Sequence, residues 1–171
     1  MSANLSNLIV RKIKRTDDVA AFDSIDENLN VFLKELSLQY MEEHLGVTFL
    51  AHLAGELVGY FTISMASLRV KQMKETDRIR TLDMESYPAV LIGRLAVDKR
   101  HAMQGIGKRL IQTAYGFSTR LRDQVGVRFL LVNATENSIE WWKQRGFTLL
   151  AKQSGRLQPF LYLDIKKMDG L

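Results

Sequence analysis

Two glycines follow a cluster of basic residues in the stretch DKRHAMQGIG, residues 98 to 107. The apolar run from Ala89 to Val97 before it predicts a buried strand, and the spacing from Ile106 to Leu121 after it predicts a helix. The first N–H groups of a helix lack intrahelical partners, and glycines let an anion approach the backbone closely. The pattern at Gly105 and Gly107 therefore favours a phosphate-binding loop. A purely structural role for the glycines, in turn geometry and helix packing, is the alternative.

Two common phosphate-binding motifs do not fit this stretch. A dinucleotide-binding motif needs a third glycine and an acidic residue that ends a second strand about twenty residues on, and neither is found. In a nucleoside-triphosphate loop, Ser or Thr follows the lysine, whereas Arg109 follows Lys108 here and the glycine spacing differs. A bound phosphate would therefore contact backbone N–H groups and the neighbouring bases, of which Arg100 is one.

The charge balance is compatible with a polyanionic partner but does not decide for one. The chain holds 24 Lys and Arg against 19 Asp and Glu, and the excess gathers around and after the glycine stretch. Such a surface can bind nucleic acid, although a solvated helix face gives the same composition. If a nucleic acid is the substrate, the residues expected to contact its phosphates are Lys99, Arg100, Lys108, Arg109, Arg120 and Arg122, with Arg128 nearby in the sequence.

The composition narrows the class of protein further. With 171 residues, 46% of them apolar, the chain is expected to form one domain over residues 1–171 with a sizeable core. It contains no cysteine and only three scattered histidines, so neither disulfides nor a metal site are expected. The N-terminus lacks an apolar stretch long enough for a signal peptide or a membrane span, so a cytoplasmic protein without membrane contact is expected.

The remaining patterns predict a mixed α/β (α+β) fold. Strands are expected over residues 8–13, 47–53, 57–64, 89–97, 127–132, 147–151 and 160–165, and helices over residues 28–45, 106–121 and 138–145. The second and third strands should form a hairpin around Ala54, Gly55 and Glu56. The polar stretch from Arg69 to Pro88 reads as an excursion that holds short helical pieces.

The segments LIGRLAVDKRHAMQGIGKRLIQTA and GVRFLLVNATENSIEWWKQRGF resemble the acyl-CoA-binding core of the GNAT N-acetyltransferase superfamily. With FDSIDENLNVFL and ELVGYFTIS, the resemblance spans nearly the whole chain. The segments GRLAVD and LLVNA are most similar to those of the toxin-type branch that acetylates aminoacyl-tRNA. The resemblance implies a central, mostly antiparallel sheet with a splayed pair of parallel strands, flanked by helices, and it implies acetyl-CoA as cosubstrate.

The resemblance also implies roles for individual residues. The backbone of Leu95 and Val97 would pair with the pantetheine arm, and the N–H near Leu95 would stabilise the oxyanion. The side chain of Asn137 would contact the cofactor, or it would cap a helix together with Ser138. The pyrophosphate would lie on the backbone of Met103, Gln104, Gly105, Ile106, Gly107 and Lys108.

Two residues depart from the family pattern. Ala102 replaces the usual Arg or Gln of the loop, which should weaken phosphate binding without abolishing it. Trp142 occupies the place where the family commonly has the tyrosine that protonates the leaving thiolate, and an indole N–H does not give up its proton near neutral pH. Tyr162 is the candidate replacement acid and Tyr60 is a second candidate, and a thiolate can also leave without an acid.

A guanidinium inside a predicted buried strand, that of Arg94, needs a partner. A carboxylate such as Asp98 is favoured, and a substrate phosphate is the alternative. Trp141 and Trp142 are expected to be core residues, and a platform for a base or ring is the alternative for one of them.

Three functions remain open from the sequence. The first is acetyl transfer from acetyl-CoA to an aminoacyl-tRNA, for which the branch also implies a homodimer and a small DNA-binding antitoxin as partners. The second is the same reaction on a small amine, a peptide or a protein N-terminus, which needs no basic surface. The third is a CoA-binding or nucleic-acid-binding module without turnover, which the missing tyrosine suggests.

Overall fold

The computed structural model describes residues 5–151 and 159–168. In these residues, seven strands form a sheet in the order β1-β2-β3-β4-β5-β7-β6. β4 pairs with β5 in parallel, whereas β1 with β2, β2 with β3, β5 with β7 and β6 with β7 pair antiparallel. The strands are β1 (Ile9–Lys12), β2 (Val47–Leu53), β3 (Glu56–Arg69), β4 (Ser86–Val97), β5 (Phe129–Asn133), β6 (Thr148–Leu149) and β7 (Phe160–Asp164). The predicted mixed fold with one parallel pair is confirmed.

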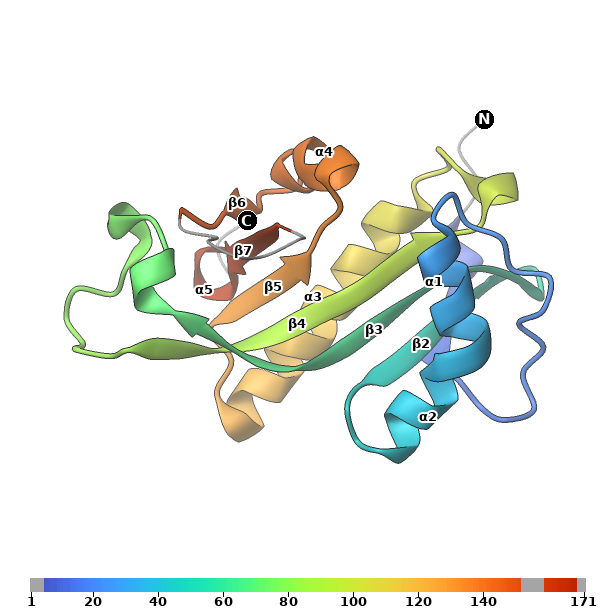
Figure 1. Cartoon of the computed structure of the whole chain (residues 1–171), viewed down its shortest axis with the longest axis horizontal. Helices are drawn as coiled ribbons and strands as arrows, with labels where there is room; N and C mark the ends of the chain where they lie inside the picture. The colour runs from blue at the N-terminus through green and yellow to red at the C-terminus, as the bar shows by residue number, and fades with distance from the viewer. Residues whose placement is uncertain (1–4, 152–158, 169–171) are drawn as a thin grey trace. The chain divides into compact units, whose positions relative to one another are not determined.

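In the part of the chain that the structure describes, four helices lie between the strands along the chain, and a fifth follows β7 (Figure 1). They are α1 (Glu27–Val31), α2 (Ser37–Glu42), α3 (Ile106–Val125), α4 (Ile139–Lys143) and α5 (Ile165–Met168), with the π-helical turn η2 (Phe32–Leu36) between α1 and α2. Short 3-10 turns are η1 (Leu5–Asn7), η3 (Val70–Gln72), η4 (Glu75–Asp77), η5 (Lys99–His101) and η6 (Glu136–Ser138). No helix among the described residues is long and apolar enough to cross a bilayer.

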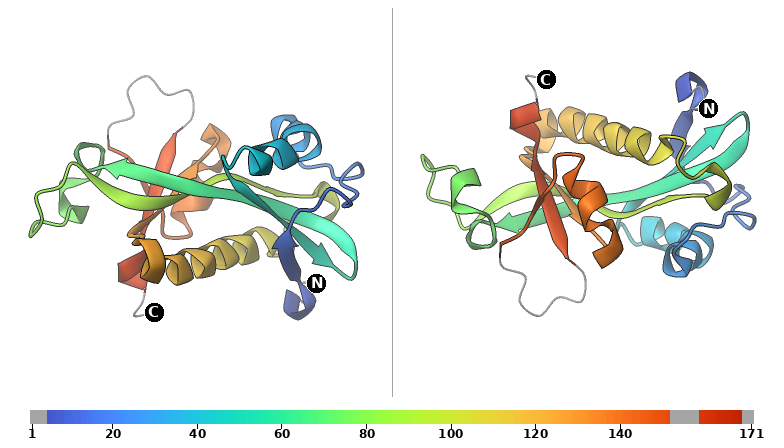
Figure 2. Two further views of the ribbon diagram at one scale, coloured as in Figure 1. Left: turned by 90° about the horizontal axis from the view of Figure 1, so that it is seen from below. Right: turned by 90° about the horizontal axis from the view of Figure 1, so that it is seen from above.

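The chain divides into two compact units, residues 1–64 with 93–114, and residues 65–92 with 115–171. In the first unit, α1 and α2 lie on one face of the β2–β3 hairpin and the beginning of α3 lies on the other (Figure 2). Its core contains Phe22, Phe32, Leu50, Tyr60 and Ala96.

The second unit has its own core around the parallel pair. Phe129 lies edge-on to Tyr162, with ring centroids 6.0 Å apart, and packs 5.5 Å from the ring of Tyr87. Leu68 and Met73 close this core and are almost fully buried. Because Met73 belongs to the excursion between β3 and β4, this excursion contributes a side chain to the core.

Local geometry explains where the elements turn. Ala54 and Gly55 have φ values of 50° and 83°, the left-handed conformation that a tight hairpin with right-handed twist requires. The predicted helix over 28–45 begins at Asp26, whose side chain caps the N–H of Asn28, and it ends early, because His44 turns to φ 56°. β3 continues to Arg69, beyond the predicted end at residue 64.

Candidate functional site

Strand β4 extends beyond the residues that pair with β5. The parallel register runs from Ala89 opposite Phe129 to Ile92 opposite Val132, whereas β4 continues to Val97. The parallel pair is the one expected from the sequence, whereas β5 itself ends at Asn133, so the splay of the two strands stays a prediction. Leu95 and Val97 lie in the part of β4 beyond the shared register, and both are half-buried.

An asparagine at the end of β5 was missed from the sequence. Asn133 follows Val132, the last residue that β5 pairs with β4, and its Oδ1 atom is buried without a hydrogen-bond partner among the described residues. A buried carbonyl oxygen without a donor is costly unless a ligand or water supplies one. In the sequence, the polar side chain of Asn133 directly after an apolar run is the feature that marks this position. The burial of its Oδ1 atom, however, cannot be predicted from the sequence.

The buried carboxylate of Asp98 anchors the loop after β4. Its Oδ2 accepts the N–H of Asp23 at 3.1 Å, and its Oδ1 accepts the N–H of Arg100 at 3.0 Å. The Arg100 guanidinium binds both oxygens, at 2.9 and 3.0 Å. Burial opposes the charged form, but these hydrogen bonds outweigh it and lower the pKa of Asp98 to about 2.

The loop then turns sharply into α3. Met103 and Gly105 have φ values of 62° and 85°, and Met103 is fully exposed. The N–H of Arg109 donates to the carbonyl of Gly105 at 3.2 Å, so the amides before it have no intrahelical acceptor. Residues 103–108 thus present the helix N-terminus that the anion argument requires, with Gln104 half-buried and Lys108 exposed.

Gly59 on β3 lets the beginning of α3 approach the sheet. A Cβ atom there would lie 2.9 Å from the carbonyl oxygen of Ala96 and 3.1 Å from Cδ1 of Leu110. Any larger residue would push β3 away from β4 or from the helix. The glycine therefore fixes the first turn of α3, with its buried Ile106, against the strands.

Two of the bases just before the glycine loop form ion pairs with the protein's own carboxylates, whereas Lys108 within the loop is exposed. Lys99 pairs with Asp23 at 3.0 Å, and Arg100 pairs with Glu56 at 2.6 Å in addition to Asp98. The side chain of His101 lies 3.2 Å from the same Glu56. Arg100 is therefore committed to internal pairs rather than available as the added charge on a phosphate.

The partner expected for Arg94 was wrong. Asp98 is occupied by Arg100, and the Arg94 guanidinium lies over the Phe32 ring, 3.7 Å from its centroid, and 5.0 Å from that of Tyr40. Stacking on ring faces stabilises a half-buried cation without a carboxylate. No spacing pattern could predict this contact, because Phe32 is far from Arg94 along the chain.

Trp142 is buried on α4, as expected for a core residue. Its ring meets Trp141 and Phe147 edge-on, with centroids 4.9 and 5.1 Å apart. Trp141 is half-buried and carries the Arg145 guanidinium 3.6 Å from its ring centroid. At this position the chain thus has a packed indole and no proton donor comparable to a phenol.

The hydroxyl of Tyr162 lies against a carboxylate. It donates to Oδ2 of Asp77 at 2.6 Å and accepts the N–H of Lys74 at 3.4 Å. Burial, together with the hydrogen bond to Asp77, raises the pKa of this hydroxyl above its ordinary value. The hydroxyl of Tyr60 donates to the carbonyl of Leu29 at 2.7 Å, and burial raises its pKa as well. The acid assignment of Tyr162 stays a prediction.

Asn137 is exposed in η6, immediately before α4. The alternative capping role receives no support from its neighbour, because Ser138 at the N-cap makes no side-chain cap hydrogen bond and its hydroxyl donates to the carbonyl of Thr135 at 3.0 Å. Residues 5–151 and 159–168 contain no group of three His, Asp or Glu side chains arranged to hold a metal ion.

Comparison with known proteins places these features in a family. Residues 14–147 match the model of the acetyltransferase (GNAT) family. A tRNA-acetylating toxin from Mycobacterium tuberculosis is 29% identical over 124 residues, which cover 72% of this chain and 74% of that protein.

Solved structures show the same fold. The structure of AtaT complexed with acetyl-methionyl-tRNAfMet superposes with a TM-score of 0.84 at 21% identity, covering 95% of this chain and 97% of that one. A tyrosine-to-phenylalanine mutant of the AtaT toxin, bound to the C-terminus of the antitoxin AtaR and acetyl-CoA, gives a TM-score of 0.76 at 22% identity, with 95% and 96% coverage. With its family match over most of its length, the chain belongs to the acetyltransferase (GNAT) family.

Proposed function

We propose that this acetyltransferase moves an acetyl group from acetyl-CoA to the amino group of an aminoacyl-tRNA. The observation that carries the proposal is the extension of β4 beyond its pairing with β5, followed at once by the positive-φ loop and the N-terminus of α3. An extended strand suits an amide-rich arm, and a helix N-terminus suits a pyrophosphate. The tRNA-acetylating relative supports the choice of acceptor.

We assign the cosubstrate contacts as follows. The backbone of Leu95 and Val97, in the part of β4 beyond its register with β5, pairs with the pantetheine amides. Asn137 contributes a further polar contact from η6. The backbone N–H groups of residues 103–108 hold the pyrophosphate, with Lys108 adding charge.

The reaction needs few side chains. The neutral amine nitrogen attacks the thioester carbonyl carbon, the N–H near Leu95 donates to the resulting oxyanion, and collapse of the tetrahedral intermediate breaks the C–S bond. The amine loses one proton to solvent or to the departing sulfur. Because Trp142 cannot supply a proton, the thiolate leaves unaided or takes one from the proposed acid, Tyr162.

Tyr162→Phe tests the acid assignment. As the acid, Tyr162 should contribute to kcat with any acceptor, so its removal should lower kcat by about a hundredfold or more for an RNA and a small amine alike. Unchanged kcat for both acceptors would remove Tyr162 from the chemistry and leave unaided departure of the thiolate.

We further propose a cytoplasmic setting, a homodimer and a small DNA-binding antitoxin as partner. The solved complex of a related toxin with the C-terminus of its antitoxin supports the last of these. Size-exclusion chromatography with light scattering tests the dimer, and co-purification with the product of the adjacent open reading frame tests the antitoxin.

The release of free CoA tests the proposed acceptor. An aminoacyl-tRNA should release the thiol stoichiometrically, whereas the same tRNA without its amino acid should release none. Turnover with a small amine but not with aminoacyl-tRNA would replace the proposal with the small-amine enzyme. No release with any amine would favour a binding module without turnover.

A further inference from the structure

Two of the six bases expected to contact phosphates, Lys99 and Arg100, form ion pairs with the protein's own carboxylates at 3.0 Å or less. Arg128 binds both oxygens of Asp164, at 2.8 and 2.9 Å. A polyanion would have to compete with these internal partners, so other bases are better placed to contact it.

The excursion between β3 and β4 carries such bases. No ion pair with a described residue is formed by any of five bases within twelve residues: Arg69, Lys71, Lys74, Arg78 and Arg80. One nearby acid, Asp77, is already committed to Tyr162 and to Lys167, the latter at 3.2 Å. The carboxylates that remain are Glu75, Asp83 and Glu85, so the bases outnumber them by five to three.

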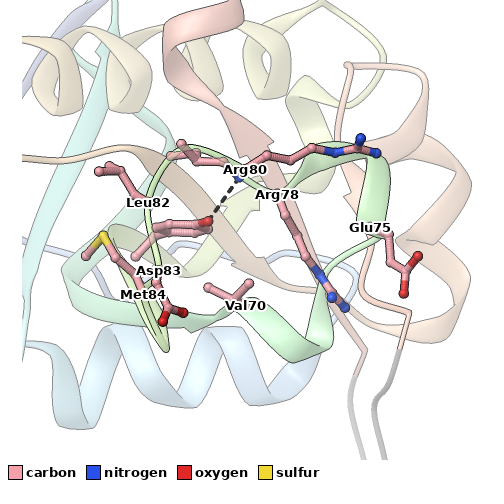
Figure 3. Close-up of a pocket in the computed structure, with 9 residues that line it drawn as sticks. Val70, Glu75, Arg78, Arg80, Leu82, Asp83 and Met84 are labelled. Carbon is pink, nitrogen blue, oxygen red and sulfur yellow. Dashed lines mark hydrogen bonds between the residues drawn. The ribbon is translucent and has the colours of Figure 1, made fainter.

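The excursion also encloses two adjoining hollows. The smaller is about 450 Å³ and the larger about 1180 Å³, and both are lined by Val70, Arg78 and Met84. Figure 3 shows Arg78 and Glu75 at one end of the smaller hollow, and Leu82, Asp83 and Met84 at the other. Arg78 is thus the charged residue that the two hollows share.

One hydrogen bond orients the Arg78 side chain, but its hydrogen-bonding capacity is not fully used. Its Nη2 donates to the carbonyl of Met73 at 3.3 Å, while its Nε is buried and has no hydrogen-bond partner among the described residues. A buried guanidinium N–H without an acceptor is costly, and a phosphate oxygen is a strong acceptor with matching geometry.

Hydrogen bonds hold the excursion in place. The Tyr87 hydroxyl accepts the N–H of Ile79 at 3.0 Å, and the Ala151 N–H donates to the carbonyl of Gln72 at 2.9 Å. The Tyr162–Asp77 hydrogen bond ties η4 to β7. The bases therefore project from an ordered surface, which lowers the entropic cost of binding.

We infer that the excursion from Arg69 to Arg80, with Arg78 at its centre, contacts the phosphate backbone of the RNA acceptor. The inference rests on the proposed function, and it assigns the steering charge to a surface other than the glycine loop. At this surface, the protein would recognise the charge and geometry of the RNA backbone and not the identity of the bases.

Two sets of variants test the inference through equilibrium binding of aminoacyl-tRNA at several salt concentrations. Lys71→Gln with Lys74→Gln removes two exposed charges, and the slope of log affinity against log salt should fall by roughly two. Arg78→Gln should weaken binding, and Arg78→Lys should restore only part of the loss, because a lysine keeps the charge without the guanidinium fork. Acetyl-CoA affinity should stay unchanged in all of them.

The matched control removes two exposed bases elsewhere, by Lys12→Gln with Lys14→Gln, and should leave the salt slope close to that of the wild type. Equal slopes in the control and in the Lys71/Lys74 variant would overturn the inference while leaving the proposed function intact. If the wild-type protein neither binds nor acetylates aminoacyl-tRNA, the proposed function fails and the inference fails with it.

Discussion

At the scale of single residues, Asp98 has the clearest energetic consequence. Its pKa is about 2 in the folded protein against 3.8 for the ordinary carboxyl, so it stabilises the fold above pH 4 and this contribution is lost as the pH falls towards 2. We expect Asp98→Asn to lower the free energy of unfolding by about 2 kcal/mol at pH 7. The deficit should shrink in urea titrations near pH 2.

The control for Asp98 is Asp123→Asn, because the Asp123 side chain is 82% exposed and has Arg122 only at 3.8 Å. It should change the free energy of unfolding by less than about 1 kcal/mol at either pH. A loss for Asp98→Asn that persists undiminished at low pH would show that packing, and not the charge, accounts for its effect.

Trp142 offers a gain-of-function test. Trp142→Tyr and Trp142→Phe lose similar ring volume, so their ratio of kcat isolates the phenolic hydroxyl. If the family's proton donor belongs here, kcat should be about tenfold higher for the tyrosine variant, measured at neutral pH under saturating substrates. Equal kcat for both variants would mean that no acid is used at this position.

The residue types in the sequence predicted the chemistry of the site better than they predicted which side chains pair with one another. The glycines, the bases and Trp142 could be found from sequence, whereas the partners of Lys99, Arg100 and Arg128 could not. Each of these bases meets a carboxylate on a distant segment, such as Asp23 for Lys99. Such contacts depend on how the strands come together, which local patterns do not encode.

At the scale of elements, the junction of β4 and α3 carries the cosubstrate assignment. Gly105 has φ 85°, so a branched residue is strained there. We expect Gly105→Val with Gly107→Val to abolish acetyl-CoA binding in calorimetry while the circular dichroism stays that of the folded protein. Undiminished affinity would remove the phosphate assignment.

The control lies in the same helix. A Cβ at Gly116 would meet only the Arg120 side chain, at 3.7 Å, an ordinary contact. Gly116→Ala should therefore leave acetyl-CoA affinity unchanged and raise the free energy of unfolding by up to about 1 kcal/mol, since alanine favours a helix interior.

Periodicity predicted most elements but not their irregularities. The hairpin, β4, α3 and the final strand pair follow from apolar spacing and turn residues. The π-helical turn at Phe32–Leu36 and the early end of the register at Ile92 do not, because both depend on contacts between segments. The predicted start of β5 at Val127 was two residues early, since pairing begins at Phe129.

At the scale of the whole molecule, family and cosubstrate follow from sequence, but the distribution of usable charge does not. The formal net charge of +5 says nothing about which bases are paired internally. The structure separates the committed bases, such as Arg100 and Arg128, from bases without an ion pair among the described residues, such as Lys71, Lys74 and Arg78. The salt dependence of catalysis should therefore depend on the bases without an ion pair and change little when the committed bases are replaced.

The most direct test of the central claim is the chemical identity of the product. The protein is incubated with acetyl-CoA, aminoacyl-tRNA and an equimolar small amine, the RNA is digested with nuclease, and the terminal aminoacyl-adenosine is weighed by mass spectrometry. We expect one added acetyl group on the amino acid of that fragment and little acetylated small amine. Acetylation of the small amine with an unmodified aminoacyl-adenosine would contradict it.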